Sequence, residues 1–360
     1  MNADAAADLL ISGLVPGGEA LWLEMEGCTL RVSSNSASLV EYLGRYFEPV
    51  RVAPAVPDLE VVAIERVPPD PGVPFRDWAR EPGKNGRKDA IAGLSDGRLI
   101  RKIRTGMLFL QSAEWRVAAG PCLKNTSQVI NFINAQYMNW LQQRGWLICH
   151  AAGVVHQDQC LGIAGFSGGG KSTLMLRLID HERVRFLTND RMFVRKANRQ
   201  VLSLGVPKLP RVNPGTIVHN ERLHSLIPGP EREVLLALPS EDLWRIEEKY
   251  DVPIPALYGP GKIVSAATLG ALVVLNWTLQ SGEPMGIRRI DLRSRRDLLL
   301  AIMKSPGPFY QYPDGSFQQD SQPFDEEAYL QVLDGIAVYE ITGRVDFDNL
   351  KNHCLSRIIG

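Results

Sequence analysis

The sequence predicts an α/β protein with a large core of alternating strands and helices, preceded by a smaller α+β domain. Three observations predict it. Residues 162–176 read GIAGFSGGGKSTLML, a glycine-rich turn between an apolar strand and a helix. Strand-like and helix-like runs alternate from about residue 126 onward. Residues 90–119 read instead as a strand meander, with Asp96-Gly97 and Thr105-Gly106 as turn signals.

The composition is that of a soluble globular protein. The 360 residues suffice for two domains, and the formal net charge is zero. This balance argues against a nucleic-acid-binding or membrane-surface protein. The one basic cluster, Arg98 to Arg104, lies on an alternating stretch and is expected to be a solvated strand face.

The five cysteines are scattered without CxxC spacing, so neither a disulfide framework nor a zinc site is expected. Cys149 and Cys160 lie in apolar runs and are expected in the core. The N-terminus has no basic segment before its short apolar run, and no apolar run approaches the roughly 18 residues of a membrane span. We expect a cytoplasmic protein.

Residues 1–122 are expected to form the α+β domain, and residues 123–360 the core. In the first, apolar residues at four-residue spacing predict a helix near residues 36–47, and 67–75 is a proline-rich loop. A longer amphipathic helix is expected over 126–144, capped by Thr126 or Ser127. Its apolar stripe consists of Val129, Ile130, Ile133, Tyr137 and Leu141.

The core's glycine-rich turn matches GxxxxGK[ST], the pattern of a phosphate-binding loop. Glycines turn backbone N–H groups inward around an anion, and the following helix N-terminus adds a partial positive charge. In this pattern the lysine reaches the β- and γ-phosphates and the serine hydroxyl holds Mg²⁺. The nucleotide-binding residues are therefore expected to be Gly165, Ser167, Gly168, Gly169, Gly170, Lys171, Ser172 and Thr173.

Such a loop needs an acidic residue at the end of a neighbouring strand to orient the metal. VRFLTND supplies Asp190, only 19 positions after Lys171, so a single short helix separates loop and acidic strand. Asn189 and Asp190 also fit a simple turn between two strands. Further along, Lys208 and Arg211 lie between prolines in GVPKLPRVNPGT and could present rigid cations to the loop.

Several later segments complete the core. Residues 242–252 are expected to be a charged helix, and 271–277 a buried strand. Residues 287–305 are expected to form an edge strand and then a helix with Arg295 and Arg296 in its first turn, although the arginines of this segment leave a nucleic-acid patch open.

Over residues 150–195 the chain resembles the HPr kinase/phosphorylase family, and specifically its kinase B branch through 205–216. The family has an HG-type strand, a GDSGxGKS loop, one helix and an ADDRV strand; this chain has HAAGVV, the glycine loop, one helix and TNDRMFV in the same order. The resemblance covers about 70 residues and implies the P-loop fold shared by HPr kinases and PEP carboxykinases.

The resemblance also implies residue roles. Lys171 and Ser172 match the phosphate lysine and the magnesium hydroxyl, and Asp190 matches a metal-site aspartate. His150 matches a histidine near the phosphates, and Arg191 matches the arginine of the ADDR motif; a core histidine and a surface arginine are the alternatives. The implied catalytic residues are His150, Lys171, Asn189, Asp190 and Arg211.

Asn189 is the main departure, because it stands where the family has the aspartate that takes the substrate proton. An amide cannot accept a proton as a carboxylate does. Phosphoryl transfer is carried mostly by positioning and electrostatics, so a kinase remains the expectation, with Asp190 or His150 as proton acceptor. A nucleotide-binding regulatory pseudo-kinase without turnover is the alternative.

The resemblance therefore implies an ATP-dependent kinase that uses Mg²⁺ and transfers a phosphoryl group to a serine of a protein or peptide, or to a small alcohol. An ABC-type ATPase or a GTP switch is disfavoured, since neither an LSGGQ-like signature nor an NKxD motif is present. The expected partner is this phosphate acceptor, with neither nucleic acid nor membrane, and the family's rings suggest a homo-oligomer.

Overall fold

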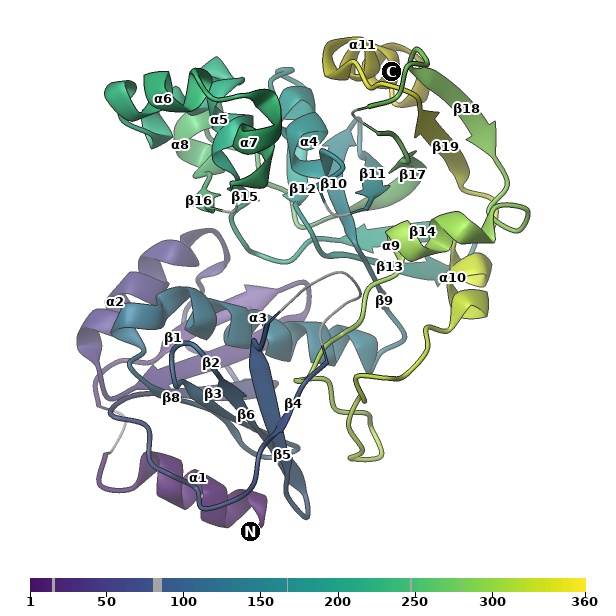
Figure 1. The fold of residues 1–360 in the computed structure, drawn as a ribbon. Coiled ribbons are helices and arrows are strands. Elements are labelled where there is room, and N and C mark those ends of the chain that lie inside the picture. Colours follow the sequence, from purple (N-terminus) through teal and green to yellow (C-terminus); the bar gives the residue numbers. More distant parts are fainter. Residues whose placement is uncertain (15–16, 80–85, 167, 247, 279) are drawn as a thin grey trace. The chain divides into compact units, whose positions relative to one another are not determined.

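The computed structural model describes residues 1–360 except 15–16, 80–85, 167, 247 and 279. The chain forms two compact units (Figure 1). The first comprises Met1–Gly145 and Ser305–Phe324, and the second comprises Trp146–Lys304 and Asp325–Gly360. This division differs from the expected one at residues 122 and 123, because the long helix after that point packs on the sheet of the first unit and a later segment returns to it.

The first unit is built on a sheet that has eight strands in the described residues, in the order β1-β2-β3-β8-β7-β6-β5-β4. The helices α1 (Ala3–Ile11), α2 (Ala37–Tyr46) and α3 (Thr126–Gln142) accompany it. The strands are β1 (Leu21–Met25), β2 (Cys28–Ser34), β3 (Leu59–Glu65), β4 (Arg76–Asp77), β5 (Asp89–Gly93), β6 (Gly97–Lys102), β7 (Leu108–Ser112) and β8 (Arg116–Gly120).

The predicted meander over 90–119 is confirmed, since β5 to β8 pair antiparallel in sequence order. The predicted stripe on α3 is confirmed too: Val129, Ile130, Ile133, Tyr137 and Leu141 are all buried. The expected side-chain cap is not formed, because Asn125 is the N-cap residue and a 3-10 turn leads directly into the helix.

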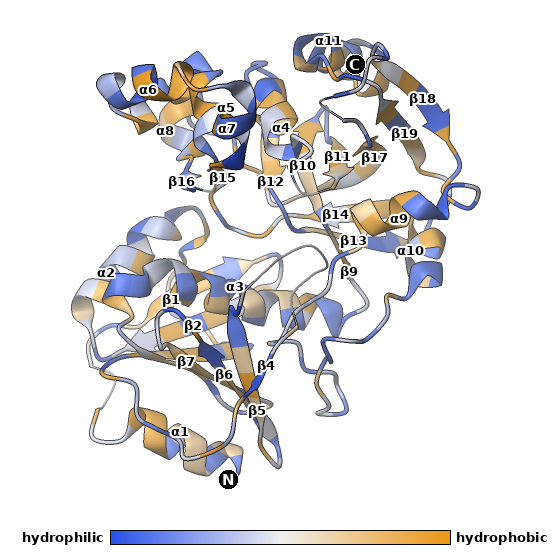
Figure 2. Cartoon of the chain, in the orientation of Figure 1, coloured by the Kyte–Doolittle hydropathy of each residue, from blue (hydrophilic) through white to orange (hydrophobic). Residues whose placement is uncertain are grey.

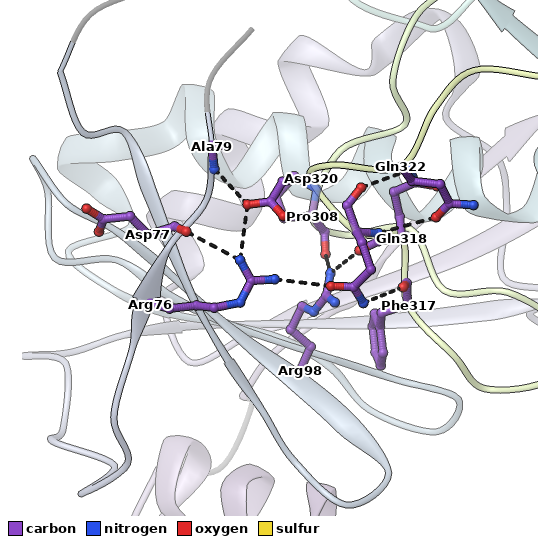
Figure 3. A network of polar contacts seen from close by, with 10 residues as sticks. Arg76, Asp77, Ala79, Arg98, Pro308, Phe317, Gln318, Asp320 and Gln322 are labelled. Carbon is purple, nitrogen blue, oxygen red and sulfur yellow. Dashed lines mark hydrogen bonds and ion pairs between the residues drawn. The ribbon is translucent and has the colours of Figure 1, made fainter.

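The basic cluster is only in part the solvated strand face that the alternation predicted, because Arg104 is exposed but Arg98 is buried. Arg98 is only 4% exposed and donates hydrogen bonds to the carbonyls of Pro308 and Gln318, at 3.1 and 2.9 Å (Figure 3). Its guanidinium lies 4.5 Å from the ring centroid of Phe317. Lys102 pairs with Asp89 at 2.6 Å. The returning segment 305–324 covers this face, which the local pattern could not show.

The second unit contains a sheet in the order β12-β10-β11-β17-β14-β13-β9, with β19 pairing β17 and β18 pairing β19. The strands are β9 (Leu147–Cys149), β10 (Ala151–His156), β11 (Gln159–Gly165), β12 (Arg185–Thr188), β13 (Met192–Ala197), β14 (Gln200–Leu204), β17 (Ala266–Leu275), β18 (Gly286–Ile290) and β19 (Ala337–Thr342). β17 runs parallel to both β11 and β19. β10 is antiparallel to β11 and to β12, so β12 also runs parallel to β11.

The central strands of this sheet are buried on both faces, which explains their continuous apolar runs (Figure 2). In β17, Val273 and Leu275 join one apolar cluster with α4 (Lys171–Ile179), whereas Leu272 and Val274 join the other with α9 (Leu299–Ile302) and α10 (Glu326–Val332). Cys149 and Cys160 are fully buried, as expected.

A mostly helical segment connects β14 to β17. It contains β15 (Arg211–Val212), α5 (Pro214–Val218), α6 (Gly229–Leu236), α7 (Ser240–Arg245), β16 (Tyr250–Asp251) and α8 (Ile254–Tyr258). The predicted helix over 242–252 is therefore wrong in its second half. Residues 250–251 pair with β15 instead, and strand pairing overrides the charged, helix-like composition.

Near the end of the chain, β19 is followed by α11 (Phe347–His353). Within the described part of the chain, none of the helices combines the length and the apolar character that a bilayer crossing requires.

Candidate functional site

The glycine-rich loop joins the end of β11 to the start of α4, as the sequence predicts. Gly168 and Gly170 have positive φ angles of 78° and 86°, which favour glycine. At Gly170, moreover, a Cβ atom would lie 2.3 Å from Cζ of Phe347. The chain therefore needs glycine here both for its conformation and for its close packing. Ser167 lies outside the described residues.

No side chain among the described residues caps the first N–H groups of α4, so these groups can bind an anion. The N-cap residue of α4 is Gly170, which has no side chain to accept from the first N–H groups. The Lys171 ammonium donates to the carbonyl of Gly165 at 2.8 Å and lies 3.4 Å from that of Phe166. The lysine side chain thus folds back along the loop, within reach of an anion bound there.

Asn189 and Asp190, which follow β12, make different contacts near the loop. The Ser172 hydroxyl donates to Oδ1 of Asn189 at 2.8 Å. The expected metal pair was Ser172 and Asp190, but Asn189 is the residue whose contact with Ser172 the structure shows. Thr173 is within 3.3 Å of Thr216 on α5, hydroxyl to hydroxyl.

Asp190 instead pairs with a histidine and a lysine. Its Oδ1 lies 3.2 Å from Nε2 of His150, and its Oδ2 lies 3.2 Å from Nζ of Lys304. Desolvation acts to raise the pKa of Asp190, but the hydrogen bond with His150 and the charge of Lys304 outweigh it and hold that pKa well below its usual range.

His150 is partly buried and its pKa is lowered. Desolvation is the largest cause; the charges of Lys304 and Lys171 add to it, and the hydrogen bond with Asp190 opposes it. The imidazole is therefore neutral at pH 7, where its ordinary pKa of 6.5 already favours the neutral form. A neutral imidazole next to an ionised carboxylate is able to accept a proton.

Lys304 was not identified from the sequence. It follows α9, far along the chain from the glycine loop, and no motif marks it. Backbone pairing brings it here, because the N–H of His150 donates to the carbonyl of Ile302 at 2.7 Å and Met303 forms a β-bridge with Cys149. Only the tertiary pairing of these segments places the lysine next to Asp190.

Lys208 and Arg211, the two cations that the sequence predicts after β14, lie in different environments. Desolvation, with the nearby charge of Arg191, lowers the pKa of Lys208 to about 8, while Asp190 acts in the opposite direction. Desolvation also lowers the pKa of Arg191, which is not an ordinary surface arginine. Arg211 pairs with Asp251 at 3.2 Å and donates to the carbonyl of Lys249. Its contacts are those of the β15–β16 ladder.

The arrangement fits a magnesium–nucleotide complex in its donor types. The oxygens of Ser172, Asn189 and Asp190 are hard ligands of the kind Mg²⁺ takes, usually with several waters retained. No group of three or more His, Cys, Asp or Glu side chains could hold a metal within the described residues.

No family model matches this sequence, and no curated protein is significantly similar to it. Among solved structures, the chain is similar to the Hpr(Ser) kinase/phosphatase from Coxiella burnetii, with 15% identity and a TM-score of 0.28. The match covers 58% of this chain and 96% of that one. A likeness at this level decides neither fold nor activity.

Proposed function

We propose that this protein is an ATP-dependent kinase that transfers the γ-phosphoryl group of Mg-ATP to a hydroxyl. One observation carries the proposal. The glycine loop with Lys171 and the His150–Asp190 pair meet at one edge of the same sheet, because β11 and β12 run parallel. In this proposal, phosphate binding by the loop and proton acceptance by His150 therefore take place at the same end of these strands.

The loop supplies the anion site. Backbone N–H groups at the start of α4 and the positive end of its dipole favour the β- and γ-phosphates. The Lys171 ammonium leaves the carbonyls of Gly165 and Phe166 for phosphate oxygens, which are stronger acceptors because they are charged. The oxygens of Ser172 and Asn189 would hold Mg²⁺, which supplies neutralisation of the charge that develops on the phosphates.

The proton acceptor is His150 supported by Asp190. A carboxylate whose pKa lies well below its usual range is a weak base, whereas a neutral imidazole has a pKa nearer the operating pH. Asp190 orients the ring through Nε2, so the other ring nitrogen takes the proton. The acceptor oxygen forms its bond to the γ-phosphorus, the bond from that phosphorus to the bridging oxygen breaks, and ADP leaves with the electron pair.

This pair also bears on the alternative of a regulatory protein without turnover. That alternative rests on Asn189, which cannot accept a proton. With Asn189 bonded to Ser172 and His150 next to Asp190, the absence of a carboxylate at position 189 does not remove the base. The acceptor we propose is a serine of a protein or peptide, or a small alcohol.

The test is ADP release from Mg-ATP by the purified chain, with and without a lysate fraction. Release that depends on the lysate is expected, and the labelled product identifies the acceptor. Lys171→Ala should reduce it by about 10²-fold or more, the loss typical of removing one donor to a transition-state oxygen. The control is Lys196→Ala, an exposed lysine on β13. ATP binding without release under any condition would favour the regulatory alternative.

A further inference from the structure

Three aromatic rings lie against the glycine loop. Trp277 follows β17 and Phe347 begins α11, which follows β19. Both strands are parallel to β11 and lie across it from β12. The third ring is Trp244 on α7. Trp277 and Phe347 therefore flank the loop on the side opposite Asp190.

Each ring contacts one of the three consecutive glycines. The Trp277 indole N–H donates to the carbonyl of Gly169 at 2.8 Å. Phe347 packs on Gly170, and the indole nitrogen of Trp244 lies 3.4 Å from where a Cβ on Gly168 would be. Ring centroids are 5.6 Å apart for Trp244 and Trp277 and 5.9 Å for Trp277 and Phe347. The rings form one continuous aromatic group.

The position of the Trp277 ring is fixed by the preceding residue, Asn276. Asn276 donates from its side chain to Glu340 at 2.8 Å and from its backbone to Ile341 at 2.9 Å. Glu340 is 1% exposed and is held by Arg295 as well. The turn that carries Trp277 is thus anchored to β19.

The Trp244 ring is partly open to solvent. Trp244 is 43% exposed, although Leu243 on the same helix packs on Gly215 of α5 and so positions α7. The contact between the hydroxyls of Thr216 and Thr173 joins α5 to α4. An indole with a large exposed surface, held beside an anion site, is an arrangement that stacks a flat ring.

We propose that Trp244 stacks the base of the bound nucleotide, with Trp277 and Phe347 as its support. The occupant follows from continuity with the loop: a nucleotide with its phosphates there extends its base to one side, and the side opposite Asp190 is the aromatic one. The co-substrate class is therefore a nucleoside triphosphate rather than an inorganic polyphosphate. This inference rests on the proposed function of the loop.

Calorimetric titration with Mg-ATP and with magnesium tripolyphosphate tests it. Trp244→Ala should weaken Mg-ATP binding by about 5- to 100-fold, the range that loss of one base–aromatic stack produces. Binding of tripolyphosphate should be unchanged. Trp244→Phe should restore most of the Mg-ATP affinity, because it keeps a ring. Leu236→Ala, an exposed apolar residue on α6, is the matched control and should change neither ligand.

The outcomes separate the two proposals. If Lys171→Ala abolishes tripolyphosphate binding but Trp244→Ala leaves Mg-ATP binding unchanged, the loop holds phosphates and the stacking proposal is wrong. If Trp244→Ala weakens the binding of both ligands equally, the ring supports the structure of the loop and the stacking proposal is wrong. If neither ligand binds the wild type, or if binding does not need Lys171, both proposals fail.

Discussion

Asn189 and Asp190 show how much one position changes at the residue scale. Both follow β12, but the amide contacts Ser172 and the carboxylate contacts His150 and Lys304. An amide oxygen is a neutral metal ligand, and a carboxylate adds a charge. In the kinase that we propose, the magnesium ligands therefore carry one formal negative charge fewer than they would with aspartate at 189.

Asn189→Asp tests this assignment. The added charge should lower the Mg²⁺ concentration needed for half-maximal ADP release by about 10-fold, since ligand charge tunes the affinity of such sites. Turnover at saturating Mg²⁺ should change little. The check is a Mg²⁺ titration of ADP release by both proteins. Turnover only in the variant would instead support the regulatory alternative for the natural chain.

The pH dependence of kcat/KM tests the His150–Asp190 pair. In the proposed mechanism neutral His150 accepts the proton. This form is lost as pH falls through the lowered pKa of His150, so the acid limb should have its midpoint below pH 6.5. Positive Lys208 is lost as pH rises through its pKa of about 8, which should give an alkaline limb there.

A rate profile from about pH 5 to about pH 10 measures both limbs. Lys208→Arg should move the alkaline limb to higher pH, because a guanidinium stays charged throughout this range. An acid limb centred above pH 6.5 would remove His150 as the base, and an alkaline limb unaffected by Lys208→Arg would remove Lys208 from the reaction.

At the scale of elements, the parts that local chemistry controls were predictable. The glycines, the strand before them and the helix after them follow from backbone freedom and apolar periodicity, and β11, the loop and α4 lie where expected. Buried strands such as β17 were equally clear. The failure at 242–252 has a different cause, since residues 250–251 become a strand only by pairing with β15.

The same limit explains why parts of the candidate site were missed. Lys304 reaches Asp190 through the pairing of Met303 with Cys149, and Trp244 reaches the loop through the packing of α7 on α5. Single residues that no motif surrounds give no signal of such pairings. Their neighbours in space come from distant segments, so sequence spacing is uninformative there.

At the scale of the whole molecule, the chain returns to its first unit near the end. Segment 305–324 joins that unit through Arg98 and through Arg76, which pairs with Asp320 at 3.0 Å (Figure 3). An alternating basic stretch usually indicates a solvated face. Here a segment more than two hundred residues away covers it, and the buried guanidinium satisfies two carbonyls.

Arg98→Met should therefore destabilise the first unit by about 2–4 kcal/mol, because two buried carbonyls lose a charged donor. Urea denaturation measures the free energy of unfolding. Arg45→Met, which removes only an exposed pair with Glu41, is the control and should change it by less than about 0.5 kcal/mol. Equal stability of the two variants would show that the buried arginine contributes nothing.

The sequence by itself determined the glycine loop, the strand and helix that hold it, the meander of β5 to β8 and the amphipathic α3, because each depends on residues within one or two turns or strands. The tertiary structure alone decided the unit boundary, the burial of Arg98, the partners of Asn189 and Asp190, and the placing of Lys304 and Trp244. Those features depend on contacts between segments far apart in the chain, and such contacts leave no local periodicity.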